Sequence, residues 1–180
     1  PDTLDEHRSS IIATADDVTA LGRQAQQIDQ FVSAQESSSQ VDLTQVVEAV
    51  LDRLSTTDVT VTTDMPETAI ITMNRQAATS AIESPLENAF NYAASSAAVT
   101  ITTTDGGYCV IISDDGPGIP VAEVNAMGRG TEDPLKHTTG LGLWQLKLAV
   151  MVLNGDVSFE IDNGTTVRID IPDNAASEME

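Results

Sequence analysis

The clearest structural signal in the sequence is a pair of β-rich runs at residues 99–104 and 108–113, separated by Asp105-Gly106-Gly107. Asp-Gly and Gly-Gly pairs between two such runs are typical of tight hairpin turns, because glycine and aspartate tolerate the positive φ that these turns require. We therefore expect an antiparallel hairpin in the middle of the chain.

Helical and strand patterns alternate on both sides of this hairpin. Asp42 is suited to cap the helix that follows it, whereas Pro85 lies inside another helical pattern, where an interior proline costs ~3 kcal/mol or more and predicts a kink. The elements together predict an α/β fold of the α+β two-layer sandwich type, with a mixed sheet of about five strands and helices on one face. We expect helices at residues 43–54, 75–94 and 141–153, and strands at 59–64, 69–73, 99–104, 108–113, 157–161 and 166–171.

A long heptad-patterned helix is expected before this domain. Its apolar seam needs a partner, so we expect a homodimer through this helix, with packing on the helix's own domain as the alternative. The predicted organisation is a dimerising helix at 1–36, a Ser-rich linker at 37–41, a globular domain at 42–173 and a disordered acidic tail at 174–180. The seam consists of Ile11, Val18, Ala25 and Val32, with Leu21 and Ile28 between them.

The charge of the chain limits its partners. Eight basic residues stand against 28 acidic ones, which gives a formal net charge of −20. A basic surface for nucleic acid or for an anionic membrane cannot readily be built from so few cations, so we expect neither contact. Such acidity is typical of proteins adapted to high salt, where the Debye length falls to ~3 Å near 1 M. An acidic surface without salt adaptation is the alternative.

The single Cys109 cannot form an internal disulfide, and its apolar neighbours suggest a buried strand thiol. A lone thiol of this kind favours a reducing, cytoplasmic compartment. The sequence shows no signal peptide and no apolar run near the ~20 residues that span a bilayer. We expect a cytoplasmic protein or the cytoplasmic part of a longer, membrane-attached sensor.

The second hairpin strand runs directly into Asp114-Asp115-Gly116-Pro117-Gly118. A carboxylate accepts hydrogen bonds from an exocyclic amine, and glycines let the backbone pass close to a flat ring. The motif therefore suits a flat polar ligand, although an ordinary turn remains the alternative.

Gly140-Leu141-Gly142-Leu143 opens the predicted helix at 141–153. Free N–H groups and the positive end of the helix dipole favour phosphate at such a position. Close packing of the helix on the sheet is the alternative. The segment matches neither a Walker loop nor a Rossmann fingerprint.

Asn88, Asn91 and Tyr92 lie within one turn of the predicted helix at 75–94 and share a polar side. An amide oxygen is a suitable ligand for a hard cation such as Mg²⁺, which takes few protein ligands beside nucleotide phosphates. A solvated or capping role is the alternative for these residues.

The order of these three motifs resembles the N box and the two glycine boxes of the ATP-binding catalytic domain of sensor histidine kinases. That domain belongs to the superfamily that includes DNA gyrase and mismatch-repair ATPases. The resemblance covers roughly residues 41–172 and extends to the closing Gly164-Thr165-Thr166-Val167. Residues 5–34 are similar to the second helix of the dimerisation and phosphoacceptor hairpin that precedes the domain in such kinases.

The resemblance implies a role for each motif residue. Asp114 would accept the adenine amine, Gly116 and Gly118 would shape the purine pocket, and Asn88 would bind Mg²⁺. The remaining residues would contact or close over the phosphates of ATP: Asn91, Tyr92, Gly140, Leu141, Gly142, Leu143 and, from the loop at 116–139, Lys136 and His137, with Arg129 as a further cation there.

The function implied is that of a protein-histidine kinase. Such an enzyme binds Mg·ATP and donates the γ-phosphoryl group to a histidine, from which the group passes to an aspartate of a response regulator. His7 is followed by Arg8 rather than an acid, so we place the phosphoacceptor histidine outside this chain.

Two alternatives remain open. One is a degenerate, non-catalytic relative that regulates a partner, favoured by Ser84, Pro85 and Thr138 where the family pattern differs. The other is a gyrase-type ATP hydrolase, which needs a glutamate four residues before Asn88, where this chain has Ser84.

Overall fold

The computed structural model describes residues 38–54, 59–120 and 140–173. The predicted helix at 1–36, most of the loop at 116–139 and the acidic tail lie outside the described residues. The elements in chain order are β1 (Ser39–Asp42), α2 (Leu43–Leu54), β2 (Thr60–Asp64), β3 (Ile70–Met73), α3 (Arg75–Tyr92), β4 (Ser96–Thr104), β5 (Gly107–Asp114), α5 (Gly140–Val152), β6 (Asp156–Ile161) and β7 (Thr165–Pro172).

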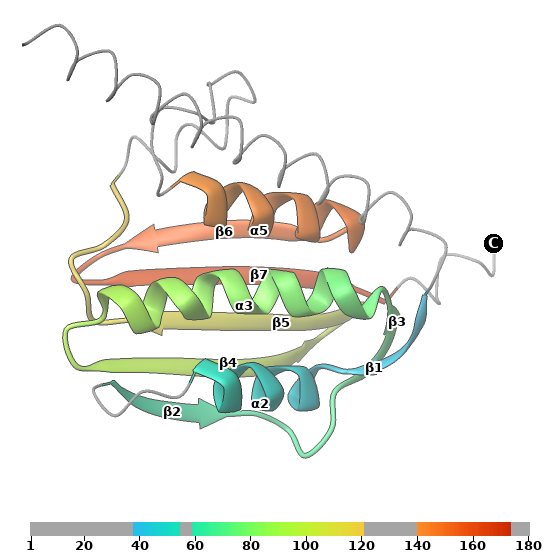
Figure 1. The fold of residues 1–180 in the computed structure, drawn as a ribbon. Coiled ribbons are helices and arrows are strands. Elements are labelled where there is room, and N and C mark those ends of the chain that lie inside the picture. The colour runs from blue at the N-terminus through green and yellow to red at the C-terminus, as the bar shows by residue number, and fades with distance from the viewer. Residues whose placement is uncertain (1–37, 55–58, 121–139, 174–180) are drawn as a thin grey trace, which may run out of the picture.

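The main sheet has five strands in the order β2-β4-β5-β7-β6 (Figure 1). β2 runs parallel to β4, and the remaining neighbours are antiparallel, so the sheet is mixed. The predicted hairpin is confirmed: Thr104 pairs with Gly107, and Asp105-Gly106 forms the two-residue turn between β4 and β5.

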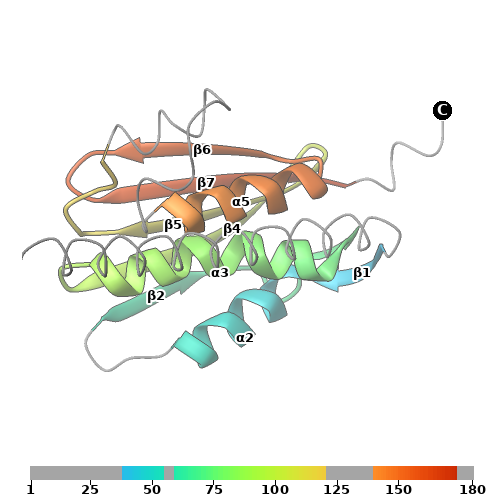
Figure 2. The same ribbon diagram turned by 45° about the horizontal axis from the view of Figure 1, so that its top comes forward.

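The three described helices cover one face of this sheet, which confirms the predicted two-layer sandwich (Figure 2). Strand alternation explains the arrangement: Val110 and Ile112 of β5 point into the core, between residues that point to the other face. The helices contribute their apolar stripes, including fully buried Ile82 and Leu146.

A small antiparallel ladder of β1 and β3 lies beside the main sheet. Residues 39–41, for which the sequence predicts a linker, are instead part of this strand pair. Asp42 ends β1 and caps α2 as expected, because its Oδ1 accepts the backbone N–H of Thr44 at 3.1 Å. The same oxygen accepts the N–H of Ala69 at 2.9 Å, so one carboxylate joins the start of α2 to the residue before β3.

α3 is one continuous helix with Pro85 inside it, at the position where the sequence predicts a kink. Asn74 caps its start, since Asn74 Oδ1 accepts the N–H of Ala77 at 2.8 Å. Pro85 lacks the N–H that a helical residue donates, but the apolar side chains around it, including Ile82 and Leu86, are fully buried. Core packing on both sides of Pro85 is what keeps the helix together.

Among the described helices, none combines the length and the apolar character that crossing a bilayer requires.

Candidate functional site

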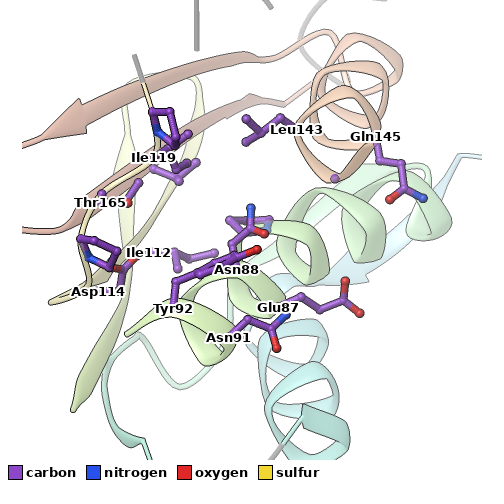
Figure 3. A pocket seen from close by; sticks show the side chains of 16 residues that line it. Glu87, Asn88, Asn91, Tyr92, Ile112, Asp114, Ile119, Leu143, Gln145 and Thr165 are labelled. Atoms are coloured by element: carbon purple, nitrogen blue, oxygen red, sulfur yellow. The ribbon is translucent and has the colours of Figure 1, made fainter. Parts of the chain in front are cut away.

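A cavity of about 500 Å³ lies between α3, the end of β5 and the start of α5 (Figure 3). Elements far apart in the sequence meet here. In the helix layer, α3 and α5 lie side by side, and the cavity lies at the end of the sheet where β5 ends. Seven of the residues singled out from the sequence line it: Asn88, Asn91, Tyr92, Asp114, Gly118, Gly142 and Leu143.

Asp114 is the last residue of β5 and lies half-buried at one end of the cavity. Its Oδ1 accepts the backbone N–H of Gly116 at 2.8 Å, which orients the carboxylate. The second oxygen can then accept a hydrogen bond from a ligand. A flat ring that carries an amine fits this end of the cavity.

Gly116 does not line the cavity but shapes it from behind. A Cβ at Gly116 would lie 2.4 Å from the carbonyl oxygen of Tyr92, so only glycine allows the turn to lie against the end of α3. Gly118 has φ +82°, a left-handed conformation that favours glycine. These two glycines give the turn after β5 its shape.

Asp115 points away from the cavity and holds this turn from the other side. Its Oδ1 accepts the N–H groups of Ser95 and Ser96 at 2.9 and 3.0 Å, and its Oδ2 accepts their hydroxyls at 2.6 and 3.0 Å. These hydrogen bonds, that from the Ser95 hydroxyl first, hold the pKa of Asp115 far below its usual range. The sequence motif around Asp115 does not indicate this role.

α3 supplies the polar wall of the cavity. Asn91 and Tyr92 follow Asn88 by three and four residues, so all three side chains project from one side of the helix toward the cavity. Glu87 also lines the wall. Partial desolvation raises the pKa of Glu87, and the Glu83 carboxylate raises it further, against a lowering by Arg53.

α5 begins at Gly140, and its first turn forms the opposite wall through Gly142 and Leu143. Helix N-termini favour anions, so this wall suits phosphate. Gly140 belongs to the helix, but its surroundings and those of the Leu141 side chain lie outside what the structure describes. Lys136, His137 and Arg129 are likewise outside the described residues.

Several residues line the cavity although the sequence predicts no ligand-binding role for them. Ile112 and Val167 belong to neighbouring strands and give the cavity an apolar floor; strand alternation could have indicated both. Thr165 is buried and pairs with Asp114 in the ladder between β5 and β7. The other missed lining residues are Pro85, Gln145, Pro117, Ile119 and Pro120.

Metal binding here would need few protein ligands. The described residues contain no group of three or more His, Cys, Asp or Glu side chains that could hold a metal ion. A hard cation such as Mg²⁺ needs only one protein oxygen when ligand oxygens and water complete its coordination. The amide oxygen of Asn88 is suited to be that one protein ligand.

The sequence profile of the family described as "Histidine kinase-, DNA gyrase B-, and HSP90-like ATPase" matches residues 73–175. A search of curated proteins gave no match.

Several solved structures share the fold. A mycobacterial sensor histidine kinase, MprB, is 23% identical with a TM-score of 0.65, over 76% of this chain and 97% of that one. The Acinetobacter baumannii histidine kinase AdeS is 22% identical with a TM-score of 0.64, over 87% of this chain and 80% of that one. The ATP-binding domain of PrrB from Mycobacterium tuberculosis is 19% identical with a TM-score of 0.62, over 77% of this chain and 98% of that one.

Proposed function

The chain belongs to the family of histidine kinase-, DNA gyrase B- and HSP90-like ATPases, and we propose that it binds Mg·ATP and donates the γ-phosphoryl group to a histidine. The observation that carries the proposal is that Asp114, Asn88 and the first turn of α5 line one and the same cavity. The proposed setting is two-component signalling, with a homodimer through the N-terminal helix and a response regulator as the later recipient.

Each wall of the cavity has a task in this proposal. The adenine amine donates to Asp114, whose orientation is set by Gly116. The purine lies on the apolar floor of Ile112 and Val167. Asn88 would hold Mg²⁺ through its amide oxygen, and the N-terminus of α5 would bind the phosphates. Bound Mg²⁺ supplies neutralisation of the phosphate charge, which a chain of net charge −20 needs.

In the transfer step, a ring nitrogen of the acceptor histidine attacks the γ-phosphorus, and the bond to the β–γ bridging oxygen breaks to release ADP. Phosphoryl transfer depends mainly on positioning and charge stabilisation. The cavity residues therefore bind and orient, and the nucleophile comes from a histidine outside this chain.

Hydrolysis is disfavoured by the residue four positions before Asn88. Ser84 is buried there, and its hydroxyl donates to the carbonyl oxygen of Gly142 at 2.6 Å. A neutral hydroxyl is far too weak a base to activate water, unlike the carboxylate of a glutamate at the same place. Ser84 also departs from the family pattern at this position. This departure favours the second candidate function, a regulatory module that binds nucleotide without transferring phosphate.

Nucleotide recognition is tested by calorimetric titration of the 180-residue chain with ATP and with GTP, each with Mg²⁺, in molar KCl. We expect ATP to bind more tightly than GTP, because the carboxylate of Asp114 accepts from the adenine amine and repels the carbonyl oxygen of guanine. Asp114→Asn should weaken ATP binding at least tenfold. Asp105→Asn, the same change in the exposed hairpin turn, is the control and should bind as wild type does. Equal affinity for ATP in both variants would contradict the proposed site.

Phosphoryl transfer is tested by following γ-labelled ATP. With the chain alone, we expect release of inorganic phosphate to stay at the rate of the buffer. When a dimerisation hairpin with a phosphoacceptor histidine is added, we expect an acid-labile, base-stable label on that hairpin, lost in Asn88→Ala. Binding of ATP without any labelled acceptor would favour the regulatory alternative, and steady phosphate release would favour hydrolysis.

A further inference from the structure

α3 and α5 are joined at the cavity by one hydrogen bond between residues 58 positions apart, from the Ser84 hydroxyl to the Gly142 carbonyl oxygen. Ser84 lies in the interior of α3 and is only 6% exposed. Gly142 lies in the first turn of α5 and lines the cavity. The bond therefore fixes the cavity wall formed by α5 to a buried point of α3.

The two helices approach so closely at this point that the contact tolerates little change. A Cβ at Gly142 would lie 3.3 Å from Ser84 Oγ, closer than an ordinary van der Waals contact. Serines in helix interiors often bond to a carbonyl one turn back in their own helix. Here the hydroxyl reaches the neighbouring helix instead, so its donor joins the two helices.

The same bond joins the walls of two hollows. Ser84 lines a second, smaller hollow of about 250 Å³, which is polar and also contains Ser80 and Glu83. Gly142 lines the main cavity, and Glu87 and Gln145 line both. Loss of the bond would remove a polar link between α3 and the first turn of α5 at the place where the two hollows adjoin.

Asn88 follows Ser84 by four residues, so the two side chains project from the same side of α3. The residue that holds α5 and the residue proposed to hold Mg²⁺ are therefore one helical turn apart. Any phosphate between Asn88 and the N-terminus of α5 would depend on the separation of these two helices.

We propose that Ser84 is a positioning residue, which sets the distance of the first turn of α5 from Asn88 and thereby tunes phosphate binding without affecting adenine binding. This inference rests on the proposed function. It assigns a task to a residue that departs from the family pattern.

The test compares ATP with adenosine, which carries the ring but no phosphate. In Ser84→Ala, we expect the Kd for Mg·ATP to rise about fivefold to tenfold, the effect of one hydrogen bond, while the Kd for adenosine stays within about twofold. Ser80→Ala, the same change one turn earlier on α3, should leave both values as in wild type. An unchanged ratio of the two Kd values in Ser84→Ala would overturn the inference.

A double variant tests whether the two residues act as one unit. Gly142→Ala adds a methyl group against Ser84 Oγ, so it should weaken ATP binding in wild type. The same change should cost less in the Ser84→Ala background, where that oxygen is absent. Strictly additive effects would contradict a shared contact.

A measurement without nucleotide separates this inference from the proposed function. Trp144, the single tryptophan, lies two residues after Gly142. Ser84→Ala should shift its emission to longer wavelength and speed hydrogen exchange in the first turn of α5, with the exchange of α2 unchanged. Unchanged emission and exchange would overturn the inference even if ATP binds. A wild type that binds neither ATP nor adenosine would overturn the proposed function instead.

Discussion

Asp114 and Asp115 are adjacent carboxylates with different tasks. Asp114 faces the cavity and is oriented by the N–H of Gly116, whereas Asp115 faces Ser95 and Ser96 at the entry to β4. The second carboxylate keeps the turn after β5 attached to the sheet, so that the first can face a ligand. At the scale of single residues, the site depends on both carboxylates, one facing the cavity and one holding the turn.

The first prediction concerns the acid sensitivity of Asp115. Its folded pKa is depressed, so its stabilising contribution is complete above the unfolded value of about 3.9 and is lost as the pH falls toward the folded pKa. Asp115→Ala should therefore be less stable than wild type at pH 6, and the difference should shrink below about pH 4. Urea denaturation in molar KCl measures this, and a difference that stays constant down to pH 3 would contradict it.

That Asp114, Gly118 and Asn88 line one cavity agrees with the motifs in which the sequence places them, whereas their roles toward ATP and Mg²⁺ stay predictions. The lining role of Thr165 was not predictable from the sequence, because it depends on the pairing of β5 with β7. The bond from Ser84 to Gly142 was not predictable either, since its partners are 58 residues apart. No local pattern reveals such contacts.

At the scale of the elements, local patterns predicted the helices and the hairpin, but not the ladder of β1 with β3. In that ladder, Val41 pairs with Ile71, and all of α2 and β2 lie between these two residues in the sequence. The four-residue strands are too short to give a clear alternation, and the polar start of β1 is typical of a linker. Pairing over this distance is decided by packing rather than by local sequence.

The second prediction concerns the junction of α2 and β3. Asp42→Ala removes the cap of α2 and leaves the N–H of Ala69 without its acceptor. The free energy of unfolding should fall by about 2–4 kcal/mol, the sum of a lost cap and an unsatisfied buried donor. Asp52→Ala, an exposed position on the same helix, is the control and should change it by no more than about 0.5 kcal/mol. Equal effects in urea denaturation would contradict this account of the junction.

At the scale of the whole molecule, the acidic excess dominates. With a net charge of −20, repulsion between carboxylates opposes the compact state at low salt. The ion pairs of Arg53 with Glu83 and of Arg168 with Asp170 are both substantially exposed. Surface pairs of this kind offset little of the repulsion.

The third prediction is that the chain is stabilised by salt, as a protein adapted to high salt would be. Raising KCl from about 0.1 M to about 1 M shortens the Debye length from ~10 Å to ~3 Å, so the Tm should rise. Circular dichroism measures the transition, and sucrose of equal osmolality, which does not screen charge, should raise the Tm less. A Tm that is independent of KCl would refute the adaptation.

The central claim is that one cavity holds Mg·ATP, with adenine at Asp114 and metal at Asn88. The most direct test is a crystal structure of the chain with Mg²⁺ and a non-hydrolysable ATP analogue, grown in high salt. We expect the adenine amine within about 3 Å of an Asp114 carboxylate oxygen, the metal on the Asn88 amide oxygen, and the phosphates at the first turn of α5. An analogue bound elsewhere, or bound in the cavity with its adenine away from Asp114, would contradict the account.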